Sequence, residues 1–227
     1  MDSRLYQKSI TCPVCSKPFE ITKVKSNGSK IESVDSDFCV YYEGINPILY
    51  DVWICEHCGY AAQADKFESI TFKDSKLILE NITPRWTKRS FAGERTVENA
   101  IETFKLALYT LHVRNAKNSE LAKVCIRIAW LYRILQSPKE REFLEFALRS
   151  YTNAFETERF PVDKLDEFTC MFMIGELNRR VGNTEEAVKW FSRIISSPDA
   201  RSNRKLLEKT REQYEVVKGQ LGNETAN

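Results

Sequence analysis

The chain has 227 residues, of which 42% are hydrophobic, and a formal net charge of +2 at pH 7. This length suits one large domain or two small ones, and no run approaches the roughly 18 apolar residues that a membrane helix requires. The first residues, MDSRLYQKSITC, contain no apolar signal core. We therefore expect a cytoplasmic protein that does not engage a membrane.

The charge is divided unevenly along the chain. Residues 1–80 carry 9 basic and 12 acidic side chains, whereas residues 81–227 carry 25 basic and 20 acidic ones. A dedicated DNA-binding protein usually shows a concentrated basic stripe, and neither part has one. The composition favours a mixed, solvated surface over a phosphate-binding one.

The N-terminal part alternates strand patterns with turns. We predict a strand over residues 8–11, a half-buried strand of period two over residues 19–24, and its return strand over residues 31–34 after a Ser-Asn-Gly-Ser turn. The run ILYDVWI, residues 48–54, is short, β-branched and aromatic. These properties predict a buried strand rather than a helix.

Two CxxC turns follow strand patterns, and they place four cysteines in two pairs: Cys12, Cys15, Cys55 and Cys58. The total of seven cysteines is odd, which suits metal thiolates and reduced thiols better than a disulfide framework. Zinc prefers four soft ligands in a tetrahedron, and each turn supplies one edge of it. We predict one structural Zn²⁺ at these four residues. A redox dithiol is disfavoured because the βαβ pattern around such motifs is absent.

Other polar residues near these turns leave alternatives open. Cys39 is either a small buried hydrophobe, which we favour, or a thiol that replaces another ligand or lies near the metal. His57 lies inside a turn whose cysteines already face the metal, so we expect it to be a surface residue. The alternative is that His57 replaces one of the cysteines as a metal ligand. Asp35 and Asp37 have the spacing of hard-cation ligands, but no carboxylate cluster joins them. We interpret them as turn and hydrogen-bonding residues.

The segment over residues 81–95, NITPRWTKRSFAGER, places basic side chains among aromatic ones. Such an arrangement can bind single-stranded nucleic acid by stacking and charge, and the candidates are Arg85, Trp86, Lys88 and Arg89. Four cations are few for a track along a phosphate backbone. We favour a linker whose aromatic side chains dock one domain on the other.

From Thr96 the hydrophobic period becomes helical. Caps and apolar stripes predict six helices, over residues 96–111, 119–136, 138–157, 161–181, 184–196 and 204–221. Gly175, Gly182, Ala187 and Phe191 stand at the spacing of a tetratricopeptide repeat, in which small residues let two helices approach closely. The same spacing is echoed at Ala100, Phe104, Ala107, Ala147, Tyr151 and Ala154. The alternative is an ordinary α-bundle with coincidental spacing.

The order of motifs resembles one bacterial family. CPVC, DSDF, YYEGINPILYDVWICEHCGYAA, SFAGERTVENAIETFKLAL and IRIAWLYR follow one another as they do in the domain of unknown function 2225. The resemblance implies an α+β protein, with a small zinc-ribbon-like β module before an all-α tetratricopeptide-like domain. It implies zinc ligation by Cys12, Cys15, Cys55 and Cys58. We expect the module in residues 1–80, a linker in 81–95 and the helical domain in 96–227.

Three functions fit these features. The first is a non-catalytic adaptor that binds a protein or peptide through its helical repeats. Only two histidines exist, His57 and His112, and neither lies in a recognisable triad or metalloprotease motif. The sequence also has no phosphate loop, so we expect neither enzyme activity nor a small-molecule substrate. The second is a nucleic-acid-associated zinc-ribbon protein. The third is a thiol sensor in which oxidation near Cys39 releases zinc.

Overall fold

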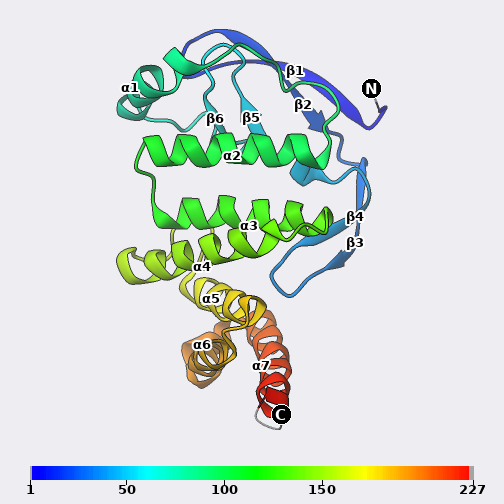
Figure 1. The fold of residues 1–227 in the computed structure, drawn as a ribbon, viewed down its shortest axis with the longest axis vertical. Coiled ribbons are helices and arrows are strands. Elements are labelled where there is room, and N and C mark those ends of the chain that lie inside the picture. The colour runs from blue at the N-terminus through cyan, green and yellow to red at the C-terminus, as the bar shows by residue number, and fades with distance from the viewer. Residues whose placement is uncertain (1, 225–227) are drawn as a thin grey trace. The chain divides into compact units, whose positions relative to one another are not determined.

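The structure of the protein is a computed structural model that describes residues 2–224. In this part of the chain, three two-stranded antiparallel sheets are followed by seven α-helices (Figure 1). The α+β class predicted from the sequence is therefore confirmed. No described helix is both long enough and apolar enough to cross a bilayer.

The chain divides into two compact units. The first comprises the chain up to Val34, Val40–Ala116 and Trp130–Glu140, and the second comprises Asp35–Cys39, Lys117–Ala129 and the chain from Arg141 onward. These units do not follow the domain ranges predicted from the sequence. The compact units are defined by contacts, whereas the predicted domains are parts of the chain that fold independently. The predicted domain ranges therefore stay a prediction.

Two hairpins of the first unit each end in a cysteine turn. β1 (Leu5–Thr11) pairs with β2 (Pro18–Val24), and β5 (Val52–Ile54) pairs with β6 (Ala61–Gln63), both antiparallel. The loop of the first hairpin holds CPVC, and the loop of the second holds CEHC. The alternation predicted for β2 is present, since Phe19 and Ile21 are buried while Glu20 between them is exposed.

The strand predicted over residues 31–34 exists, but its predicted partner was wrong. β3 (Ser29–Val34) pairs with β4 (Val40–Gly44), whereas β2 pairs with β1. The turn at CPVC is short enough to return the chain directly, so β1 occupies the edge of β2 that the prediction assigned to β3.

The prediction of one strand over residues 48–54 was also wrong in part. Three short 3₁₀ helices occur among residues 2–224: η1 (Pro47–Tyr50), η2 (Thr83–Arg85) and η3 (Asp199–Ser202). The first replaces half of that strand because the Asn46 side chain accepts a hydrogen bond from the Ile48 amide, and Pro47 has the φ that a helical first turn needs. Only β5 is strand, and its three residues are buried.

Aromatic side chains form the centre of the first unit's core. Phe67 is fully buried, and its ring centroid lies 5.6 Å from that of Phe19, 5.8 Å from Trp53 and 4.8 Å from Tyr60. α1 (Phe72–Asn81) contributes Ile78 to this core. These contacts join both cysteine hairpins to one apolar cluster.

α2 (Val97–Val113) packs against β5 and β6 in the first unit (Figure 1). It begins with a capping box, in which the Thr96 side chain accepts from the Asn99 amide and the Asn99 side chain accepts from the Thr96 amide. Its apolar face, Ala100, Ile101, Phe104, Ala107 and Leu111, is buried as the period predicts.

The remaining helices are α3 (Asn118–Ile134), α4 (Lys139–Thr157), α5 (Glu167–Val181), α6 (Thr184–Ser196) and α7 (Arg204–Glu224). The predicted start at residue 161 was wrong. The Asp166 carboxylate caps the amide and hydroxyl of Thr169, which fixes the start of α5 at Glu167. Before it, Val162 and Leu165 form an isolated bridge.

α5 and α6 form a tight helical hairpin. A Cβ atom at Gly175 would lie 2.7 Å from the Phe191 ring, so only glycine permits this approach. Gly182 ends α5 with a φ of +91°, the left-handed conformation typical of a helix C-cap. Ala187 is buried on α6. This pair has the small-residue contact predicted for a tetratricopeptide-like repeat, and the repeat architecture of the whole helical region stays a prediction.

Candidate metal centre

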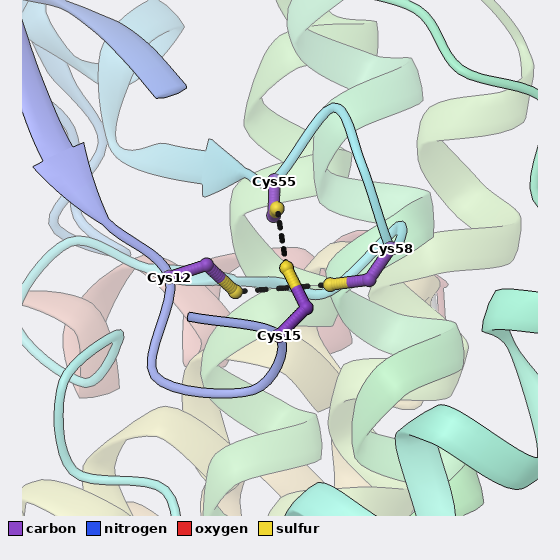
Figure 2. A group of neighbouring side chains, drawn as sticks. All are labelled: Cys12, Cys15, Cys55 and Cys58. Carbon is purple, nitrogen blue, oxygen red and sulfur yellow. Dashed lines mark hydrogen bonds between the residues drawn. The ribbon is translucent and has the colours of Figure 1, made fainter. Parts of the chain in front are cut away.

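Four cysteine sulfurs from the two hairpin loops form one cluster. The Sγ atoms of Cys12 and Cys58 are 3.7 Å apart, and those of Cys15 and Cys55 are 3.6 Å apart (Figure 2). All four sulfurs lie within 4.8 Å of one another. Each close pair joins one loop to the other, so the structure brings together all four residues that the sequence analysis named as zinc ligands.

The two turns have the same local geometry. The Ser16 amide donates to the Cys12 carbonyl, and the Gly59 amide donates to the Cys55 carbonyl, both at 2.9 Å. The donor residue is left-handed in both turns, with φ of +58° at Ser16 and +76° at Gly59. Glycine adopts this conformation without steric cost, so the second turn carried a sequence signal for it, whereas the serine of the first gave none.

Trp86 covers the second cysteine turn. Its indole Nε1 donates to the Glu56 carbonyl at 2.8 Å, and a Cβ atom at Gly59 would lie 2.6 Å from its ring. Thr83 Oγ1 donates to the Cys58 carbonyl at 3.0 Å. These contacts fix the turn from outside, and together with the left-handed φ they leave no space for any side chain at Gly59.

The cluster is largely protected from solvent. Cys12, Cys55 and Cys58 are buried, and Cys15 is half-buried. The Val14 amide lies 3.4 Å from the Cys12 sulfur, with the geometry of an N–H···S hydrogen bond. Such amide donors orient thiolate ligands and disperse their charge.

Contacts among the sulfurs separate the pKa values of three of these cysteines. Hydrogen bonding to Cys55 raises the pKa of Cys12 to about 12, and hydrogen bonding to Cys12 and Cys55 raises the pKa of Cys58 well above its ordinary value. The same contacts lower the pKa of Cys55, because its thiolate accepts hydrogen bonds from Cys12 and Cys58. A divalent cation binds the thiolate forms of these groups, so its binding releases protons from thiols whose pKa is raised, such as Cys12 and Cys58.

The sulfur separations test whether zinc would fit. A tetrahedral Zn²⁺ with Zn–S bonds of about 2.3 Å places neighbouring sulfurs about 3.8 Å apart. The two closest pairs, at 3.6 and 3.7 Å, are near that edge length. A cluster of four thiols with these separations is compatible with zinc, and it is the one group among the described residues that has the donors for a metal.

The two alternative ligands lie outside the cluster. His57 Nε2 is 3.0 Å from the Pro18 carbonyl oxygen and 3.5 Å from the Glu56 carboxylate. Cys39 is buried in the second unit, in the segment Asp35–Cys39. Neither belongs to the group of four sulfurs.

Three of the four candidates for nucleic-acid contact bind groups of their own unit. Arg89 forms an ion pair with Glu102 at 2.6 Å, and its guanidinium lies 5.3 Å from the centroid of Trp86. The Lys88 ammonium lies 3.5 Å from the Glu56 carboxylate. Arg85 is solvent-exposed at the end of η2. The Trp86 ring thus packs on the cysteine turn of its own unit, and both the docking linker and nucleic-acid binding stay predictions.

The sequence analysis missed a buried cation near this centre. Arg95 is 9% exposed, and its guanidinium donates to the carbonyls of Phe91, Leu49 and Val52 at 2.9 to 3.0 Å. Burial lowers its pKa to about 10. The residue connects the linker to the strand that leads into the second cysteine turn. In the sequence, Arg95 is one of several basic residues of the linker, and nothing in its neighbours indicates a buried guanidinium.

A second group of charges was also missed. Asp35 and Asp37 pair with Arg180, and Ser36 contacts Glu176, all in the second unit. The two aspartates were interpreted as turn and hydrogen-bonding residues rather than metal ligands. Both lie close to the Arg180 guanidinium, and Asp37 Oδ1 also accepts a hydrogen bond from the Cys39 amide at 3.3 Å. The partners lie at least 140 positions further along the chain, so no local pattern could have paired them.

The family described as "Uncharacterized protein conserved in bacteria (DUF2225)" matches residues 5–217. A curated relative, an "Uncharacterized protein" of Borreliella burgdorferi, is 28% identical over 152 residues, which are 57% of this chain and 53% of the relative. The chain thus spans about half the length of that curated relative. No solved structure matches the chain. Since the family match includes both cysteine turns and most of the seven helices, the protein belongs to the bacterial family of the domain of unknown function 2225.

Proposed function

We propose that this protein is a non-catalytic, zinc-binding adaptor. One Zn²⁺ is bound by Cys12, Cys15, Cys55 and Cys58, and the helices α5 to α7 bind a protein or peptide partner. The observation that carries the zinc assignment is the geometry of the four sulfurs, which are contributed in pairs by two hairpins at separations close to a tetrahedral edge.

The donor set favours a structural role for the ion. Catalytic zinc sites usually have three protein ligands and keep one position open for water or substrate. Four thiolates would fill the tetrahedron, and three of these cysteines are buried. The ion would act as a cross-link between the loops rather than as a Lewis acid.

The size of the hairpins explains why such a cross-link is useful. β5 and β6 have three residues each, and an isolated two-stranded hairpin is marginally stable in water. A metal that binds only the folded arrangement adds its binding free energy to folding. The zinc would thus hold the two loops against the shared aromatic core.

The adaptor half of the proposal is supported by the helical hairpin of α5 and α6. Its close approach at Gly175 and the packing of α6 against α7 are typical of stacked helix pairs. Such stacks present extended surfaces to partner segments.

Metal content tests the zinc half. Elemental analysis of the purified full chain is expected to give one zinc per chain in the wild type and a loss of most zinc in Cys12→Ser. The matched control is Cys125→Ser, since Cys125 is a buried cysteine of the second unit, outside the cluster. The control is expected to retain the metal. A folded wild type without zinc, after purification free of chelators, would contradict the assignment.

A further inference from the structure

The segment Asp35–Cys39 connects β3 to β4 in the sequence but belongs to the second compact unit. It lies against α5 and α7, whose contacting residues follow it by 134 positions or more. Asp37 and Cys39 of the segment are buried. A short stretch between two strands is therefore bound by helices as a peptide would be.

Polar contacts show which groups of the segment the helices bind. The Ser36 hydroxyl donates to Glu176 Oε1 at 2.5 Å and accepts from Arg180 Nη2 at 3.0 Å. The same Arg180 nitrogen lies 3.6 Å from a carboxylate oxygen of Asp35 and 3.4 Å from one of Asp37. One guanidinium thus lies close to both carboxylates and to the hydroxyl between them. Planar guanidinium groups suit such multiple recognition of carboxylates.

The aromatic residue of the segment is recognised separately. The Phe38 ring lies 5.4 Å from that of Phe172, and the Lys209 ammonium lies 4.8 Å from the Phe38 centroid. Lys209 also donates to the Asp35 carbonyl at 3.1 Å. Phe38 has a φ of +67°, which is unfavourable for a bulky residue. Such a conformation persists only where surrounding contacts offset it.

The receiving residues share one chemical pattern. Arg179, Arg180 and Lys209 supply positive charge, Phe172 supplies an aromatic face, and Glu176 supplies an acceptor that keeps the two arginines in place, at 2.6 Å from Arg179 and 2.8 Å from Arg180. We call these five residues the α5–α7 surface. They complement two carboxylates one residue apart, followed directly by an aromatic ring.

We propose that the α5–α7 surface is a docking site for acidic-aromatic peptides, and that Asp35–Phe38 is its tethered occupant. A partner protein with the same arrangement of carboxylates and an aromatic ring displaces the tethered segment. This inference rests on the proposed adaptor function and names the class of its partner.

Tethering sets the size of the expected effect. A segment held on a short connection competes at an effective concentration on the order of millimolar. An external peptide therefore binds the wild type weakly. Removal of the tethered side chains is expected to tighten apparent binding by ten-fold or more.

The experiment uses the full chain and a labelled peptide. The probe is a fluorescein-labelled peptide with the sequence of residues 34–40 carrying Cys39→Ser, and its binding is read by fluorescence anisotropy. The segment-loss variant carries Asp35→Gly, Asp37→Asn and Phe38→Gly. Together these substitutions remove both charges and the ring, and glycine at position 38 suits the left-handed φ there. Its helical circular dichroism is compared with that of the wild type. We expect binding at least ten-fold tighter to the variant.

Two controls assign the binding to the surface. Arg180→Ala in the segment-loss background is expected to weaken binding at least ten-fold, whereas Arg201→Ala, an exposed arginine of η3, is expected to leave it unchanged. A peptide with both aspartates replaced by asparagine is expected not to bind. Equal binding of the two peptides would overturn the proposal, because charge recognition would then be absent.

The fold of the segment-loss variant and the oligomeric state of the protein decide the remaining outcomes. If the segment-loss variant does not fold, the single variant Phe38→Ala replaces it, with a smaller gain in affinity expected. A folded variant that binds no more tightly than the wild type overturns the docking site. A wild-type dimer by light scattering that the segment-loss substitutions dissociate also overturns it, since the occupant would then be the segment of a second copy. Zinc content, measured on the same samples, reports separately on the metal half of the proposed function.

Discussion

Two glycines with left-handed backbone differ in what surrounds them. Gly59 has a φ of +76° and faces the Trp86 ring, whereas Gly93 has a φ of +94° and a Cβ there would meet nothing within 4 Å. Both belong to the first unit. The pair therefore separates the cost of backbone conformation from the cost of a steric clash.

Alanine at these two positions is expected to destabilise the protein unequally. Gly93→Ala should lower the free energy of unfolding by about 1–2 kcal/mol, the usual cost of a left-handed L-residue. Gly59→Ala should add a further ~1–3 kcal/mol, because the new methyl group displaces Trp86. Urea unfolding followed by tryptophan fluorescence measures both. Equal losses would show that Trp86 does not pack on the turn.

Buried and exposed ion pairs provide a second comparison. Glu176 is fully buried and pairs with Arg179 at 2.6 Å, whereas Glu186 is exposed and pairs with Lys189 at the same distance and the same i,i+3 spacing. The Glu176 contacts raise the pKa of Arg179. Removing one partner of a buried pair leaves an uncompensated charge, while an exposed pair contributes little.

Glu176→Ala is expected to lower the free energy of unfolding by about 3–5 kcal/mol, since two arginines lose their shared counter-charge. Glu186→Ala should change it by less than ~1 kcal/mol. Thermal unfolding monitored by circular dichroism gives both values. A loss at Glu176 as small as that at Glu186 would mean that solvent reaches the α5–α7 surface.

At the scale of helices, replacing either of two glycines by alanine is expected to change the free energy of unfolding in opposite directions. Gly175 lies where α5 meets Phe191, whereas a Cβ at Gly219 on α7 would meet nothing within 4 Å. Gly219→Ala is expected to stabilise the protein by up to ~1 kcal/mol through helix propensity. Gly175→Ala should destabilise it by about 1–3 kcal/mol through overpacking, despite the same propensity gain. Chemical denaturation of both variants tests this. A stabilising Gly175→Ala would contradict the close approach of α5 and α6.

Local signals explain which elements were predictable. Helical period and caps are properties of neighbouring residues, and they located the six helices from α2 to α7, with an error at the start of α5. The CxxC spacing likewise identified all four cysteines of the cluster. The Asn46 side chain that turns residues 47–50 into 3₁₀ helix competes with a strand pattern of equal strength, so composition alone favoured the wrong element.

Pairings between distant residues were not predictable in this way. Which strand occupies the edge of β2, and which helix receives Asp35 and Asp37, depends on tertiary contacts that leave no periodic trace in the sequence. Arg95 illustrates the same limit. A buried arginine satisfied by three carbonyls looks, in the sequence, like any surface cation.

At the scale of the whole molecule, metal removal is expected to act on the two units unequally. A chelator such as EDTA should speed amide hydrogen exchange in the first unit, above all in β1, β2, β5 and β6, because the proposed zinc cross-links their loops. Exchange in α5 and α6 should change little. Hydrogen-exchange mass spectrometry with and without chelator measures this. Uniform protection in both states would show that the aromatic core, rather than the metal, holds the hairpins.

The docking of residues 35–39 has a consequence for the order of events during synthesis. Lys209, which holds the Asp35 carbonyl, follows it by 174 positions. At ribosomal rates of about 5–20 residues per second, roughly 10–35 seconds separate the emergence of these two partners. Until Phe172 and Arg180 of α5 emerge the two aspartates and Phe38 have nothing to dock on, and until Lys209 emerges the docking is incomplete, although β3 and β4 beside them are already formed. The nascent chain therefore displays an acidic-aromatic segment before the finished protein conceals it.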